Sequence, residues 1–183
     1  MDDLVFETVH TTGGIKNGAL VRRIHPTSLS TLMCFTTPDG LYHVHNRIEF
    51  DDDDPRHWTH YVHHDRECFL EREHQAADPG DAIPSFAEYL LVTELLESGK
   101  EELGFTRLVE SDATLQPAVL RHEQDEVGLY LDGRMTNRHR VVGEDIIASD
   151  WGGIGSRLVH DVSELMDRLD EQVAVRVRMF LDD

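Results

Sequence analysis

Hydrophobic and polar residues alternate along several stretches of the chain, most regularly between residues 41 and 50. There the even positions hold Tyr, Val, Asn, Ile and Phe, and the odd positions hold Leu, His, His, Arg and Glu. A period of two is typical of a β-strand that buries one face. We therefore expect a strand over residues 41–50, with its even face in the core. Pro38-Asp39-Gly40 is a turn sequence, so this strand should form a hairpin with residues 31–37.

Further runs rich in β-branched and aromatic residues predict additional strands. They cover residues 4–10, 19–24, 103–109, 115–121, 127–131, 134–148 and 173–181. Asp132-Gly133 favours a two-residue hairpin turn between two of these runs. Residues 56–64 alternate poorly, so both a strand and a helix are open for them, although Trp, Thr, Tyr and Val slightly favour a strand.

Two stretches have helical periodicity. Ser85 and Glu88 have the spacing of a capping box, which predicts a helix over about residues 86–98. Apolar residues also recur at helical spacing over about residues 157–172. Strand runs separated by short turns, without repeating strand–helix–strand units, predict a single α+β domain over residues 1–183. We expect a largely antiparallel sheet of about seven to nine strands, with both helices packed on one face.

Charge is the strongest compositional feature of the chain. The formal net charge is −19, and most of the surplus lies in residues 51–126. A field of this sign disfavours direct binding to nucleic acid, which relies on Lys and Arg contacts to phosphate, and to anionic membranes. No stretch has the length of a membrane span, and the first residues lack a signal-type apolar run, so a cytoplasmic protein is expected. The two cysteines, Cys34 and Cys68, do not make a disulfide framework.

The acidic surplus favours a soluble interaction or regulatory protein that binds a basic protein partner, with nucleic-acid mimicry as a special case. The residues assigned to this partner surface are Asp51, Asp52, Asp53, Asp54, Glu88, Glu94 and Glu97. The same acidity suits a salt-adapted protein, and Asp51–Asp54 is also typical of a solvated turn. No catalytic constellation stands out, so the sequence leaves open whether the protein is an enzyme.

Seven of the twelve histidines lie between residues 41 and 74, which makes a divalent-metal protein or enzyme the alternative hypothesis. The candidate ligands are His43, His45, Glu49, His60 and His64. The first three share the polar face of the predicted strand, and the other two could approach them across a hairpin. Imidazole and carboxylate groups can together hold Zn, Fe or Mn. A polar outer face on a half-buried strand explains the same pattern without a metal.

The fragment His43-x-His45-x3-Glu49 resembles the first metal-binding motif of the cupin family. The resemblance covers seven residues. Thr37 and Arg56 occupy the positions of the flanking glycines of that motif, and no clean second motif follows, so the family's properties are not carried over.

A glycine-rich loop before the second predicted helix provides a third hypothesis, an anion or nucleotide site. Backbone N–H groups at the start of a helix can bind an anion. The candidate residues are Gly153, Gly155, Ser156, Arg157, Arg138 and Arg140. The loop lacks a Walker lysine and the dinucleotide fingerprint, and a loop that only starts a helix explains the same glycines.

Overall fold

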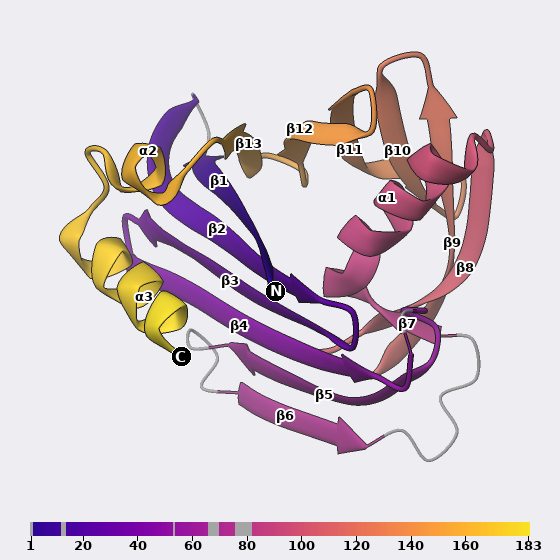
Figure 1. The fold of residues 1–183 in the computed structure, drawn as a ribbon, viewed down its shortest axis with the longest axis horizontal. Coiled ribbons are helices and arrows are strands. Elements are labelled where there is room, and N and C mark those ends of the chain that lie inside the picture. Colours follow the sequence, from indigo (N-terminus) through magenta and orange to yellow (C-terminus); the bar gives the residue numbers. More distant parts are fainter. Residues whose placement is uncertain (1, 12–13, 53, 66–69, 76–81) are drawn as a thin grey trace.

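A single curled sheet dominates the molecule. The computed structural model describes residues 2–11, 14–52, 54–65, 70–75 and 82–183. Thirteen strands of this part of the chain form one sheet that curls into a nearly closed barrel (Figure 1). They are β1 (Asp3–Thr11), β2 (Ile15–His25), β3 (Ser28–Thr37), β4 (Gly40–Phe50), β5 (Trp58–Asp65), β6 (Leu70–Gln75), β7 (Ala82–Pro84), β8 (Glu102–Val109), β9 (Thr114–Glu123), β10 (Glu126–Leu131), β11 (Arg134–Val142), β12 (Asp145–Asp150) and β13 (Gly155–Val159). The helical elements are the 3-10 turn η1 (Ser85–Ala87), α1 (Glu88–Ser98), α2 (Val162–Met166) and α3 (Glu171–Asp182).

The strand order is β6-β5-β4-β3-β2-β1-β13-β12-β11-β10-β9-β8-β7. Neighbouring strands are antiparallel except β7 and β8, which are parallel and are connected through α1. In the middle of the sheet β1 pairs with β2 on one side and with β13 on the other. The β1–β13 pairing joins Phe6–His10 to Gly155–Val159, which are segments from opposite ends of the chain.

The alternation that predicts a strand over residues 41–50 is present in β4. Val44, Asn46, Ile48 and Phe50 are buried on the inner face, and the odd-numbered residues lie on the outer face. Residues 56–64, for which two structures were open, contribute to strand β5.

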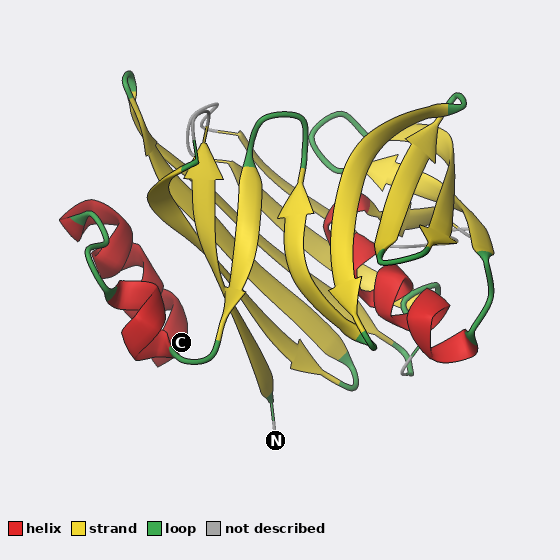
Figure 2. Cartoon of the chain, turned by 90° about the horizontal axis from the view of Figure 1, so that it is seen from above, coloured by secondary structure: helices red, strands yellow, loops and turns green. Residues whose placement is uncertain are grey.

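The helices lie on opposite sides of the sheet (Figure 2). α1 lies on the concave side and buries Leu91, Val92 and Leu95 in the interior of the barrel. α3 lies outside, where Val173 and Val177 contact an apolar patch on β2 and β3. Each buried side chain of this size contributes roughly 1.5–3 kcal/mol relative to an exposed one. None of the helices in the described ranges has the length and apolarity needed to cross a membrane.

The predicted α+β architecture is therefore wrong. The sheet has thirteen strands instead of seven to nine, and it is a nearly closed barrel without two helices on one face. Residues 157–172 do not form one helix, because Gly155–Val159 pairs with β1 as a strand. A short α2 begins only after Asp161, whose carboxylate accepts the N–H of Glu164.

Residues 173–181, which were predicted to form a strand, belong to helix α3. The side chain of Asp170 accepts the N–H of Gln172 and so caps the start of this helix. Val173, Val177 and Phe180 then fall on one buried stripe. The alternation of this segment is compatible with a strand, but the capped helix is the form that buries the stripe against the sheet.

Candidate functional site

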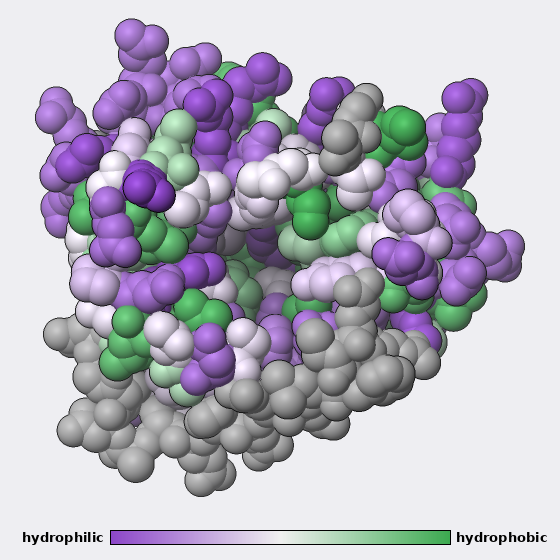
Figure 3. All heavy atoms as spheres, turned by 180° about the vertical axis from the view of Figure 1, so that it is seen from behind, coloured by the Kyte–Doolittle hydropathy of each residue, from purple (hydrophilic) through white to green (hydrophobic). Residues whose placement is uncertain are grey.

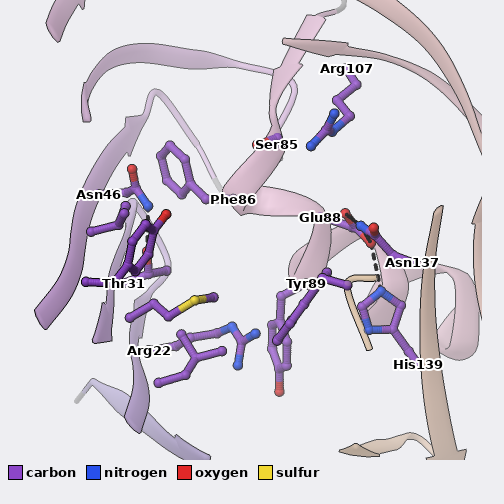
Figure 4. Close-up of a pocket in the computed structure, with 15 residues that line it drawn as sticks. Arg22, Thr31, Asn46, Ser85, Phe86, Glu88, Tyr89, Arg107, Asn137 and His139 are labelled. Carbon is purple, nitrogen blue, oxygen red and sulfur yellow. Dashed lines mark hydrogen bonds and ion pairs between the residues drawn. The ribbon is translucent and has the colours of Figure 1, made fainter. Parts of the chain in front are cut away.

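A cavity of about 200 Å³ lies between α1 and the inner faces of β2, β3 and β4 (Figure 4). Its apolar lining residues are Leu20, Met33, Tyr42, Val44, Phe86 and Trp151. Its polar lining residues are Arg22, Thr31, Asn46, Ser85, Glu88, Tyr89, Arg107, Asn137 and His139. The molecule is also hollowed near the middle of the face shown in Figure 3, where apolar and polar side chains lie together.

An ion pair is buried beside this cavity. The carboxylate of Glu7 on β1 contacts the guanidinium of Arg22 on β2, and the two residues are 1% and 5% exposed. The hydroxyl of Ser156 on β13 donates to Oε1 of Glu7 at 2.7 Å, and the guanidinium lies 4.4 Å from the ring centre of Tyr89. Burial lowers the pKa of Arg22 to about 10. Arg22 therefore stays charged at neutral pH and needs the carboxylate that faces it.

A second buried network holds Glu88, the first residue of α1. Nδ2 of Asn137 donates to both carboxylate oxygens, at 3.0 and 2.8 Å. Nε2 of His139 lies 2.7 Å from Oε1 of Glu88, and Nδ1 of the same ring lies 2.9 Å from the hydroxyl of Ser149. This string contains the residue types of a catalytic triad. Ser149, however, is buried and does not line the cavity, so the network fixes the side of the cavity formed by Glu88, Asn137 and His139 and does not present a nucleophile.

The opposite wall carries a third network. Nδ2 of Asn46 donates to the hydroxyl of Thr31 at 3.1 Å, and Oδ1 of Asn46 accepts from Nδ1 of His63 at 2.6 Å. Buried amide and hydroxyl groups are costly unless they are hydrogen-bonded, so these contacts also orient the polar groups that face the cavity.

Glu88 was predicted to lie on the exposed side of the first helix, and that prediction is wrong because the residue is only 7% exposed. The predicted capping box is absent as well. The hydroxyl of Ser85 and the N–H of Phe86 donate to the carboxylate of Glu110, at 2.7 and 3.0 Å. A sequence signal was available, because Glu88 shares the helical stripe of Leu91 and Leu95.

Glu7 and Arg22 were not among the residues predicted from the sequence to have a functional role. Glu7 occupies the same strand face as the buried Val9, and Arg22 occupies the same face as the buried Leu20. A charged residue within an apolar strand face is the pattern that would have identified them.

The structure brings the candidate metal ligands to the outer faces of β4 and β5. In the register His45 lies opposite His64, and Glu49 lies opposite His60. The rings of His43 and His64 are 6.1 Å apart. Among the described residues, no group of three or more His, Cys, Asp or Glu side chains is arranged to hold a metal ion. The shared face agrees with the sequence pattern, and a metal role stays an untested prediction.

His45 has a packing role on this outer face. Its ring lies edge-on to Phe180 of α3, with ring centres 5.4 Å apart. Burial under this helix lowers the pKa of His45, and the nearby Asp183 opposes that shift in part.

The predicted acidic partner residues are placed in two ways. Asp51, Asp52 and Asp54 lie in the connection between β4 and β5, and Asp53 lies outside the described residues. The carboxylate of Asp52 is 3.0 Å from Nδ1 of His57. This connection is exposed or half-exposed, as expected for a solvated turn.

Asp54 and Glu94 are linked through one arginine. The guanidinium of Arg56 lies 3.1 Å from Asp54 and 2.8 Å from Glu94. Glu97 is exposed on α1, whereas Glu88 faces the interior. The predicted partner surface is therefore smaller and less acidic than the sequence implies.

The glycine-rich loop does not have the predicted form. Gly155–Val159 is a strand, so no helix starts there. The carboxylate of Asp150 accepts the N–H groups of Gly152 and Gly153, at 2.9 and 3.3 Å, which occupies the donors expected to bind an anion. Ser156 is buried and bonded to the interior carboxylate described above.

The basic residues assigned to this loop lie on the outer face of the sheet. Arg138, Arg140 and Arg157 are exposed, and Arg138 lies 3.5 Å from Glu126. They and the loop do not form the predicted pocket, and the cavity described above lies on the inner face of the sheet.

No protein-family model matches the chain, and no curated protein matches it. Among solved structures, the chain is similar to a β-barrel-like protein of the domain of unknown function DUF1849 from Brucella abortus. The similarity has a TM-score of 0.50 and 8% sequence identity, and it covers 86% of this chain and 95% of that chain. At this identity the comparison supports the barrel-like fold and carries no information on function.

Proposed function

We propose that the protein binds a small, partly apolar molecule inside the barrel. The observation that carries the proposal is the cavity of about 200 Å³ that is lined by both apolar and polar side chains. Ligand sites commonly combine apolar walls with a few polar groups that converge on the ligand. An apolar cavity of about 150 Å³ can hold benzene, so this space suits a ligand of roughly six to eight carbon atoms.

The polar networks favour binding over catalysis. Both ring nitrogens of His139 already have partners, and the neighbouring Ser149 does not line the cavity. A nucleophile or base must reach the reacting atom, and this string of side chains is arranged to hold a wall in place. The proposed activity is therefore that of a carrier or sensor of a small molecule.

The test is a thermal shift experiment with neutral probes, hexanol and benzyl alcohol. At a concentration tenfold above Kd, a ligand stabilises the folded state by about 1.4 kcal/mol, which corresponds to roughly 3–5 °C for a chain of this size. Val44 lines the cavity, so Val44→Phe should reduce both the shift and the affinity measured by calorimetry. Val62→Phe on β5, which does not line the cavity, is the matched control. Absence of binding by either probe, or equal binding by Val44→Phe, would refute the proposal.

Binding of a basic protein by the acidic residues is a separate and untested hypothesis. Its remaining structural support is the exposure of Asp51, Asp52 and Glu97. No interior feature depends on that surface, so the two activities can be tested independently.

A further inference from the structure

Arg107 differs from the other charged side chains around the cavity. It lies on β8 opposite Gln116 of β9, and it lines the cavity together with Ser85 and Asn137. Leu103 and Phe105 precede it at the same alternating positions and pack against the interior core. The strand therefore directs a guanidinium toward the inside of the barrel (Figure 4).

The hydrogen bonding of Arg107 is incomplete. Nη1 donates to the neutral amide oxygen of Gln116 at 3.3 Å. Nε is buried and has no hydrogen-bond partner within the described part of the chain. The described residues likewise form no ion pair with Arg107. A partly buried guanidinium with one neutral partner has lost hydration without gaining a counter-charge.

The buried carboxylates in this part of the barrel have the hydrogen-bond or ion-pair partners that Arg107 lacks. Glu7 faces Arg22, Glu88 is bonded to Asn137 and His139, and Glu110 accepts two hydrogen bonds from the start of η1. Among the charged groups that line the cavity, the one without a counter-charge in the described residues is thus a cation. An incoming anion would supply what Arg107 lacks, whereas an incoming cation would find the carboxylates already occupied.

We propose that the ligand is a small organic carboxylate, with its anionic group bound by Arg107 and its apolar body against the wall that includes Phe86 and Val44. The proposal rests on the function proposed above and specifies its ligand class. A guanidinium presents paired donors that match a carboxylate, and its binding in a partly dehydrated site is stronger than in water. The strongly negative charge of the whole chain acts against anions at long range, but salt screens it beyond about 8–10 Å.

The experiment compares unbranched probes of six carbon atoms that differ in their polar group: hexanoate, hexanol and hexylamine, each titrated calorimetrically at neutral pH. In the unmodified protein, hexanoate should bind roughly 10- to 100-fold more tightly than hexanol, because one hydrogen-bonded charge is gained. Arg107→Gln should abolish this advantage while hexanol still binds. Arg107→Lys should keep part of it, because the charge remains without the planar pair of donors. Arg157→Gln, on the exposed outer face, should change nothing and is the matched control.

The outcomes separate the two proposals. Equal binding of hexanoate and hexanol by the unmodified protein overturns the carboxylate assignment and leaves the cavity function standing, and this result needs no variant to fold. The assignment also fails if hexylamine binds best, if the advantage of hexanoate survives in Arg107→Gln, or if it is lost in Arg157→Gln. If no probe binds, both proposals fail.

Discussion

The buried pair of Glu7 and Arg22 should be among the most sensitive points of the fold. Glu7→Gln keeps the shape of the side chain and an oxygen that can accept from the Ser156 hydroxyl. It removes the charge that faces Arg22, whose pKa of about 10 keeps it positive at neutral pH. The substitution therefore isolates one effect, a guanidinium buried without its counter-charge.

Removing one partner of a buried ion pair costs about 3–5 kcal/mol. A domain of this kind has a total stability of about 5–15 kcal/mol, so Glu7→Gln should remove a large share of it. Arg22→Met should have a similar cost, because it leaves the Glu7 carboxylate buried. The double variant should cost at least about 2 kcal/mol less than the sum of the two, because neither uncompensated charge remains.

The assay is urea unfolding followed by circular dichroism, with the free energy of unfolding extrapolated to water. The matched control is Glu49→Gln, because Glu49 lies 3.1 Å from Arg47 in an ion pair whose side chains are 45% and 57% exposed. That variant should change stability by less than about 1 kcal/mol. Two results would refute the reasoning: a cost for Glu7→Gln no larger than that of Glu49→Gln, or full additivity in the double variant.

Three further predictions concern the outer layer. Burial raises the pKa of the Cys34 thiol to about 12. In a Cys68→Ser background, a disulfide reagent at about pH 8 should therefore label Cys34 only after unfolding. Rapid labelling of the native protein would contradict the burial of Cys34. Burial lowers the folded-state pKa of His45 below 6.5, so the unfolded chain binds more protons and the Tm should fall as the pH drops through this window. Thermal melts at several pH values should show a flatter dependence of Tm on pH for His45→Leu. An unchanged dependence of Tm on pH in this variant would contradict the assigned effect of His45. Val177→Ala on the buried face of α3 should lower the free energy of unfolding by about 1–2.5 kcal/mol in the same urea assay. Val175→Ala, at a position 41% exposed, should lower it by less than about 0.5 kcal/mol. Equal losses would mean that α3 does not pack on the sheet as described.

The strand over residues 41–50 was predictable because its signal is local. The period of two in β4 assigns each side chain to the buried or the exposed face of the strand. The segment from Val173 onward carries two signals at once, since its apolar residues fit both an alternating strand and a helical stripe. The helix prevails through the Asp170 cap and the outer patch on β2 and β3, which no local pattern reveals.

The interior site was less predictable for a different reason. Sequence patterns assign charged residues to solvent, whereas Glu7, Arg22 and Glu88 occupy apolar faces. Each is stabilised by a partner on another element. Glu7 and Arg22 meet across the β1–β2 hairpin, whereas Glu88 of α1 meets Asn137 of β11 only when the helix packs inside the curled sheet. The sequence could have identified these charged residues as exceptions on otherwise apolar strand or helix faces. It could not have predicted which residues pair or the cavity between them.

The pairing of β1 with β13 has a consequence for how the protein folds. On either side of that seam the strands follow the order of the chain, so each half can assemble from successive local pairings with low contact order. Among the strand pairings described, only the seam joins residues from opposite ends of the chain, and closing so large a loop carries an entropic cost that the other pairings do not share. Ser156 of β13 donates to Glu7 of β1 across this seam, so the hydrogen bond that supports the interior charge pair forms only when the two halves meet. Assembly of the ligand cavity and closure of the chain into one cooperative unit would then be the same late event.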